Sequence, residues 1–168
     1  KALEFGVEVP MDVSVRAWRY LKRHHIDTRI ADILSKDRGG WYEVTTLNYI
    51  LSRYPSADWY GGVIDDDLRR RMLDFSFKHW AQHSTYMKAY LALTLNAMDR
   101  RKDALLVWES VLDAAKETED QGTFWAAEDR SWLWHNDRIE SHAMALRATQ
   151  ELKPTEEKLD GMVLWLFL

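Results

Sequence analysis

Hydrophobic residues recur with a helical period along almost the whole chain, and they predict two kinds of helix. The first kind is amphipathic: in residues 68–80, Leu68, Met72 and Phe75 lie on one face, opposite charged residues. Such a helix keeps one face in water. The second kind is apolar nearly all round, as in residues 84–98, and a helix of this kind must be covered on most sides.

The two kinds of helix alternate along the chain. The amphipathic segments cover residues 11–23, 68–80, 102–117 and the start of 155–167, and the apolar segments cover residues 44–54, 84–98 and 139–152. Antiparallel helix hairpins with apolar inner members and amphipathic outer members build either an α/α toroid or a superhelical solenoid. A weak repeat relates residues 92–108 to residues 145–165. We predict an all-α fold whose antiparallel helix hairpins form part of an α/α toroid, with alternating inner and outer helices.

Composition and the chain ends predict one helical domain, residues 1–168, that is a portion of a larger multi-domain protein. The length is that of a single domain, and 46% hydrophobic residues with 12% aromatic residues are ample for a core. Residues 1–5 have the composition of a helix end, and residues 165–168 form an apolar run that few proteins leave at a free terminus.

Charge and residue usage narrow the classes of function. The 23 Lys and Arg residues and the 27 Asp and Glu residues are mixed along the chain and give a net charge of −4, which argues against nucleic acid as a partner. The absence of cysteine excludes disulfides, thiolate metal sites and a cysteine nucleophile within these residues. No segment approaches the roughly 20 apolar residues of a membrane span, so we expect no transmembrane segment. No phosphate-binding glycine loop or Gly-x-Ser-x-Gly motif occurs, and we expect no cofactor.

Two polar motifs are similar to ligand sites but have simpler explanations. His79 and His83 are four residues apart, as on one helical face, yet no glutamate follows the first histidine as a zinc hydrolase requires. We therefore predict no metal site. The acidic run 65–67 lacks the second acid of a diphosphate–magnesium site, and acids are ordinary at a helix N-terminus. The expected helix caps are Asp65 or Asp66, Ser84 and Asp137.

Glu140, His142 and His135 are candidates for an acid–base group. The two histidines are seven residues apart, which stacks them roughly on one helix face. In the simpler interpretation, Glu140 is a buried hydrogen-bond acceptor that holds the neighbouring loop in place. We favour this structural role.

Aromatic pairs and loop acids leave two alternatives open. The pairs Trp41-Tyr42 and Trp59-Tyr60 adjoin glycine pairs, and such loops either stack sugars or plug the open ends of a helical ring. One alternative is therefore an α/α-toroid enzyme acting on glycans, and the other is a solenoid adaptor that binds peptides along a concave groove. A glycosidase holds two carboxylates about 5 to 10 Å apart. The loop acids that might form such a pair are Glu43, Asp58, Glu128 and Asp129.

Residues 122–146 place three tryptophans in a polar loop immediately before a helix of small and apolar residues. In this position Trp125, Trp132 and Trp134 cannot all belong to the core, so they either dock onto a neighbouring surface or hold the loop in place. We call residues 125–137 the tryptophan loop, and we expect it to seal one end of the helical barrel.

The string RSWLWHNDRIESHAMALRA in this region resembles a tract of bacterial alpha-2-macroglobulin-like proteins, within their thioester-type α/α-toroid domain. The similarity extends to residues 89–116 before it, to residues 160–168 after it and to residues 1–10. Asp137-Arg138 departs from the family pattern, and Ser141-His142 stands where Thr-Gln is expected. The residues that carry the match are Trp132, Trp134, Ile139, Glu140, Ala143 and Leu146.

This resemblance implies a secreted, periplasmic or envelope-anchored protein that entraps proteases after its bait region is cleaved. Its partners would be the neighbouring domains of the parent chain and, through the parent, the target proteases. Some family members link covalently to their targets through an internal thioester, which requires a cysteine. Because the chain has no cysteine, no thioester can form within it. The resemblance therefore implies a scaffold without catalytic residues, and no enzyme activity is expected.

Overall fold

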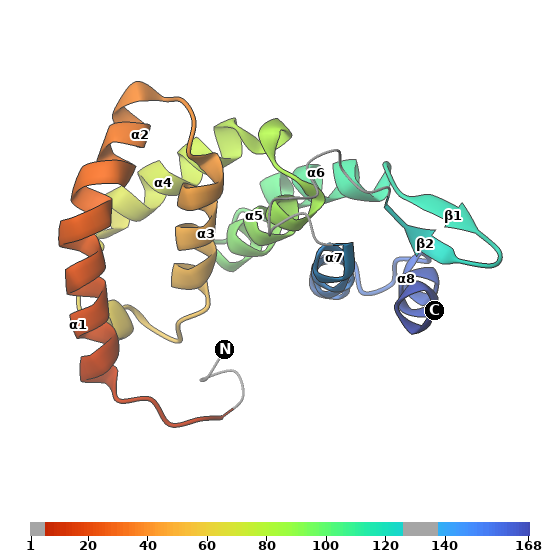
Figure 1. The fold of residues 1–168 in the computed structure, drawn as a ribbon, viewed down its shortest axis with the longest axis horizontal. Helices are drawn as coiled ribbons and strands as arrows, with labels where there is room; N and C mark the ends of the chain where they lie inside the picture. The colour runs from red at the N-terminus through yellow and green to blue at the C-terminus, as the bar shows by residue number, and fades with distance from the viewer. Residues whose placement is uncertain (1–5, 126–137) are drawn as a thin grey trace. The chain divides into compact units, whose positions relative to one another are not determined.

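The computed structural model describes residues 6–125 and 138–168, and these residues are mostly helical, as the sequence predicts (Figure 1). The chain divides into two compact units, Lys1–Phe75 and Ser76–Leu168, and the boundary lies within helix α4. Each unit has its own buried core. The organisation as a single domain stays a prediction.

The first unit begins with a helical stretch that is longer than the predicted 11–23. Three consecutive elements make up this stretch: α1 (Met11–Leu21), the π-helix η2 (Lys22–Ile30) and α2 (Ala31–Lys36). Within η2, Lys22 Nζ lies 2.5 Å from Asp27 Oδ1, a five-residue spacing that matches the i→i+5 period of a π-helix.

The remaining elements of the first unit pack their apolar faces onto this stretch. They are α3 (Trp41–Ser52), the short 3₁₀-helix η3 (Ala57–Tyr60) and α4 (Asp66–Lys78). The buried residues of the shared core include Trp18, Ile26, Ile30, Val44, Leu47 and Met72. Asp65 Oδ1 accepts a hydrogen bond of 2.7 Å from the backbone N–H of Leu68, so the predicted cap of α4 is confirmed.

The second unit is built around one helix that is buried on nearly all sides. This helix is α5 (Thr85–Ala97), and Ser84 caps it by accepting from the backbone N–H of Met87 at 3.3 Å. Helices α6 (Arg101–Leu112) and α7 (Arg138–Leu152) both pack against α5, and α8 (Leu159–Phe167) packs against α7. The prediction that residues 84–98 form a covered helix is confirmed.

A β-hairpin corrects the prediction of a helix over residues 102–117. Helix α6 ends at Leu112, and β1 (Lys116–Thr118) pairs antiparallel with β2 (Gly122–Phe124), with Glu117 opposite Thr123. Three exposed residues form β1, so no hydrophobic alternation marks it in the sequence. Gly122 adopts a φ of +72° at the end of the turn, a conformation that suits glycine.

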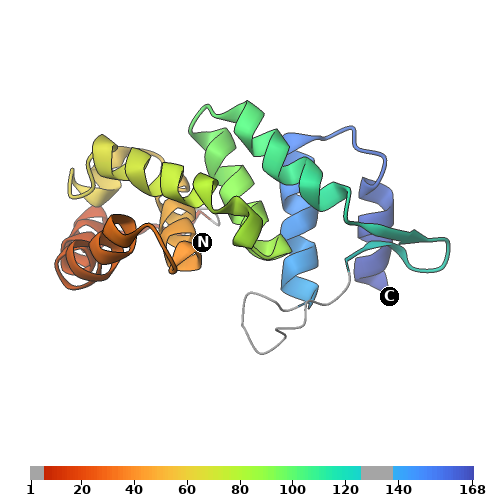
Figure 2. The same ribbon diagram turned by 90° about the horizontal axis from the view of Figure 1, so that it is seen from above.

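The hairpin lies across α8, as Figure 2 shows. At their closest approach, Gly122 and Gly161 bring β2 and α8 into direct backbone contact. A Cβ atom on Gly122 would overlap the carbonyl oxygen of Gly161, and a Cβ atom on Gly161 would overlap the side chain of Thr123. Both positions therefore require glycine for this packing.

Among the described residues, no helix combines the length and the apolarity that crossing a bilayer requires.

Candidate functional site

The tryptophan loop falls largely outside the described residues. Of its three tryptophans, only Trp125 belongs to the described part of the chain. The other predicted residues that lie outside it are Trp132, Trp134, Glu128, Asp129, His135 and Asp137. The candidate site is therefore built from the residues that flank this segment, at the end of β2 and in α7 and α8.

The residues of the family-like tract that are described lie on α7, and most of them are exposed. Ile139, Glu140 and Ala143 are exposed, and Leu146 is half-buried. The expectation that Glu140 is a buried acceptor is therefore wrong. Glu140 lies in the first turn of α7, where a carboxylate interacts favourably with the positive end of the helix dipole even in contact with solvent.

His142, which the sequence suggests only as a member of an acid–base group, is a buried polar residue of this region. Its side chain is 3% exposed. The imidazole stacks on the indole of Trp165, with ring centroids 4.2 Å apart and planes inclined by 29°, and the ring of Trp125 meets it edge-on at 5.4 Å. Three rings from three separate segments of the chain thus meet at one point.

Hydrogen bonds hold two of these three rings, those of His142 and Trp125, in place. Nε2 of His142 lies 2.9 Å from the carbonyl oxygen of Met162. A carbonyl only accepts, so Nε2 carries the hydrogen and the neutral ring keeps its lone pair on Nδ1. Trp125 donates from Nε1 to the carbonyl oxygen of Val111 at 2.8 Å. The group that we call the His142 cluster, Trp125, His142 and Trp165, therefore links β2, α7 and α8 to the end of α6.

Burial lowers the pKa of His142 below its ordinary value of 6.5, because the charged imidazolium loses its hydration. The hydrogen bond to Met162 opposes this effect but is the weaker of the two influences. A neutral histidine that donates to a backbone carbonyl is well suited to hold helices together.

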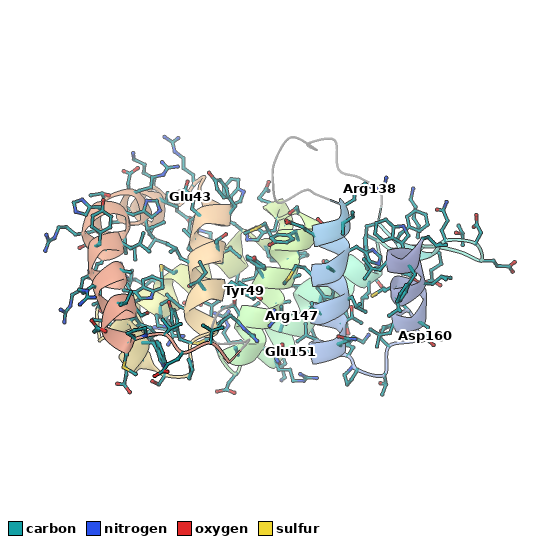
Figure 3. The ribbon with its side chains drawn as sticks, turned by 60° about the horizontal axis from the view of Figure 1, so that its bottom comes forward. Glu43, Tyr49, Arg138, Arg147, Glu151 and Asp160 are labelled. Atoms are coloured by element: carbon teal, nitrogen blue, oxygen red, sulfur yellow. The ribbon has the colours of Figure 1, made fainter. Side chains whose placement is uncertain are left out.

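A groove of about 550 Å³ opens beside the His142 cluster. Trp165 belongs to both, and the guanidinium carbon of Arg138 lies 5.8 Å from the centre of the Trp165 ring. Figure 3 shows Arg138 at the start of α7. The lining comes from the hairpin turn, the start of α7 and the end of α8, through Asp120, Gln121, Arg138, Ile139, Trp165, Leu166 and Leu168. Asp120 is the one side-chain carboxylate among these described residues, so their side chains form no carboxylate pair.

The predicted histidine pair does not share a helical face. Helix α4 ends at Lys78, His79 lies in the turn that follows, and His83 follows the short 3₁₀-helix η4 (Trp80–Gln82). The four-residue spacing therefore loses the regular α-helical geometry on which the metal hypothesis depended. No group of three or more metal-ligating side chains occurs within residues 6–125 and 138–168.

The two loop acids that are described lie at opposite ends of α3. Glu43 is in its first turn, where Figure 3 labels it, and Asp58 follows its last turn. From Glu43, α3 continues for nine more residues, about 14 Å, before the chain reaches the segment that holds Asp58, and this span exceeds the separation of a glycosidase pair. Glu43 is engaged by Arg29, whose Nη2 lies 2.9 Å from Oε1. This contact raises the pKa of Arg29.

The aromatic pair Trp59-Tyr60 packs within the first unit. Trp59 stacks on Tyr54 with centroids 6.1 Å apart, and Tyr60 is buried edge-on against Trp18. Trp18 donates from Nε1 to the hydroxyl of Tyr54 at 3.1 Å. These rings therefore pack against other aromatic residues of their own unit. Of the other pair, Trp41 packs on the core and Tyr42 is exposed.

No protein-family model, no curated protein and no solved structure matches this chain.

Proposed function

We propose that this chain is a non-catalytic scaffold portion of a bacterial alpha-2-macroglobulin-like protein that traps proteases, and that its hairpins form part of an α/α toroid. One structural observation carries the proposal: α5 is buried, and α6 and α7 cover it. A helix pair in which one member is enclosed and the other faces water is the repeating unit of such a toroid.

The contacts between α5, α6 and α7 are those of a rigid support. Leu91, Leu93 and Leu95 of α5 are fully buried. Trp108 of α6 is also fully buried, and its Nε1 donates to Thr149 of α7 at 3.1 Å. Side chains this enclosed leave little freedom for the helices to shift, and rigid helices are what a domain needs to position its neighbours.

The His142 cluster supports a structural role for the base of the tryptophan loop. Trp125 and Trp165 direct their rings onto His142 of the same chain, and Trp125 is also hydrogen-bonded to the end of α6. Two half-buried indole rings that pack on a buried imidazole are typical of a structural contact within the chain. The resemblance of the adjoining residues supplies the family, which the proposal takes from the sequence.

Under this proposal the partners are the neighbouring domains of the parent chain and, through the parent, target proteases. The parent would be located outside the cytoplasm, since entrapment acts on proteases of the surroundings. Any thioester would have to be formed by residues outside this sequence, which has no cysteine.

A substrate-size assay on the full-length parent tests the proposal. Entrapment encloses a protease without blocking its catalytic centre. Trypsin that has been mixed with the parent should therefore keep its activity on a small chromogenic peptide and lose it on a large protein substrate. Trypsin inactivated at its serine beforehand is the control, because it cannot cleave the bait and should not be retained. The proposal would be wrong if trypsin cleaved the large protein substrate equally well with and without the parent.

The reading frame around these residues offers a second test. A parent of this class carries an export signal and repeated β-sandwich domains. A short frame that encodes no large exported protein would rule out the family.

A further inference from the structure

His142 lies where four elements of the second unit meet. Its ring belongs to α7, and it touches α8 twice, by stacking on Trp165 and by donating to the carbonyl oxygen of Met162. It touches the segment after β2 through Trp125, which is in turn hydrogen-bonded to Val111 at the end of α6. This one ring therefore contributes to the attachment of α8, and of the segment after β2, to α7.

Protonation would place a positive charge where residues 6–125 and 138–168 provide little to receive it. Nε2 already carries a hydrogen, so an added proton goes to Nδ1 and makes the ring a cation. A cation at a buried position is costly, because it has lost its hydration. Indole rings attract cations, and two of them adjoin His142. Burial nevertheless has the larger effect, since the pKa of His142 lies below its ordinary value.

The charged groups of the surrounding elements do not offset this cost. On α7, Arg138 lies one turn before His142 and adds a like charge beside Trp165. Before α8, Lys158 is already paired with Glu117 of β1. The other charged residues of the described hairpin, of α7 and α8 and of the end of α6 include Asp113, Glu119, Asp120, Glu140 and Asp160, and these five are exposed. Lys116 on β1 and Arg147 on α7 are cations and would not stabilise an added positive charge.

We propose that His142 is a pH-sensitive pin, whose protonation below neutral pH weakens the attachment of α8 and the β1–β2 hairpin to α7. The proposal does not rest on the protease-trapping function. Because Trp165 and Arg138 also line the groove, acidification would reshape the groove as well.

The direction of the pH dependence follows from the linkage between proton binding and folding. The neutral ring is favoured in the folded state, so the unfolded or locally opened state binds the proton more readily. The stabilisation is fully present above a pH of about 6.5 and is lost as the pH falls below it, toward the pKa of the folded state. If the pKa of His142 is lower by one in the folded state than in the opened state, protonation can increase local opening by about tenfold.

Hydrogen exchange measured by mass spectrometry on the 168-residue chain at pH 7.5 and pH 5.5 tests the proposal. After correction for the intrinsic pH dependence of exchange, β1, β2 and α8 should open several-fold more at pH 5.5, whereas α5 should not. His142→Gln keeps a donor for the Met162 carbonyl and does not titrate, so its opening should be independent of pH. His79→Gln, in the same unit, is the matched control and should behave as the original chain.

Two results would overturn the proposal: equal local opening of the original chain at the two pH values, or a pH dependence that persists in His142→Gln. Should His142→Gln fail to fold, the imidazole C–H resonances of the original chain give an independent measurement. A titration midpoint of His142 at or above 6.5 would contradict the proposed pin, and a midpoint clearly below that value would support it.

Discussion

Thr149 connects α7 to α6 with a single buried hydroxyl group. It accepts a hydrogen bond from Nε1 of Trp108 at 3.1 Å and donates one to the carbonyl oxygen of Ala145 at 2.9 Å. Both residues are inaccessible to solvent, so neither group can exchange its partner for water. Buried polar atoms of this kind are normally hydrogen-bonded, and one that loses its partner lowers the stability of the protein considerably.

We predict that Thr149→Val lowers the free energy of unfolding by about 1–3 kcal/mol, since it keeps the shape of the side chain and leaves the indole N–H of Trp108 buried without an acceptor. Denaturant unfolding followed by circular dichroism measures the change. The control is Thr155→Val at an exposed position in the same unit, where the change should stay within about 0.5 kcal/mol. Equal effects of the two substitutions would contradict the role of this hydrogen bond.

The sequence predicts the helices well where the hydrophobic period is strong. The predicted segment 84–98 is close to α5, and 44–54 overlaps α3. The prediction from the sequence misses η2 and α2, although the buried residues Ile26, Ile30 and Ile33 have a helical spacing that indicates a helix there. The polar and charged residues between them obscure that spacing.

Sequence patterns do not predict the hairpin or the His142 cluster, for a different reason. The hairpin is positioned by the contact of Gly122 with Gly161, and the cluster joins Trp125, His142 and Trp165 from three segments. A local pattern predicts elements but does not tell which distant side chains meet. The predictions for Trp132 and Trp134 remain predictions.

At the level of the element, Gly161 decides whether the hairpin can dock on α8. In an exposed helix, replacing glycine by alanine stabilises by about 1 kcal/mol. Here the added methyl group would overlap Thr123 of β2, so we predict the opposite sign: Gly161→Ala destabilises the chain by about 1–3 kcal/mol and increases amide exchange in β1 and β2.

The matched control is Asp160→Ala, at the neighbouring exposed position of α8. It should leave exchange in the hairpin unchanged. A Gly161→Ala variant that is more stable than the original chain would show that the hairpin does not pack on α8 as described.

For the chain as a whole, three groups with raised pKa values, Tyr90, Lys153 and Lys158, make the stability decrease at high pH. Burial and the 2.6 Å hydrogen bond between Tyr86 and Tyr90 raise the pKa of Tyr90 well above its ordinary value of 10.0. Hydrogen bonds to Glu156 and Glu117 raise the pKa values of Lys153 and Lys158. In each case the protonated form is favoured by folding, so the contribution is present at neutral pH and is lost as the pH rises above about 10.

We therefore predict that the free energy of unfolding declines above pH 10 and that Tyr90→Phe reduces this decline. Denaturant titrations between pH 8 and pH 11 measure it. Tyr20→Phe, at a side chain that is 67% exposed, should leave the decline as it is. If both variants show the same pH profile as the original chain, the Tyr86–Tyr90 pair does not carry this effect.

The contact between Gly122 and Gly161 also bears on the order in which the second unit folds. The hairpin is local and can form quickly, but its docking surface is α8, which lies later in the chain, beyond α7. Contacts that close long stretches of chain form late, because the entropy of loop closure must be overcome before they stabilise anything. Gly122 and Gly161 are 39 residues apart, close to the separation of 41 between Trp108 and Thr149, so hairpin docking is expected together with the packing of α7 on α6 and after the local pairing of α5 with α6.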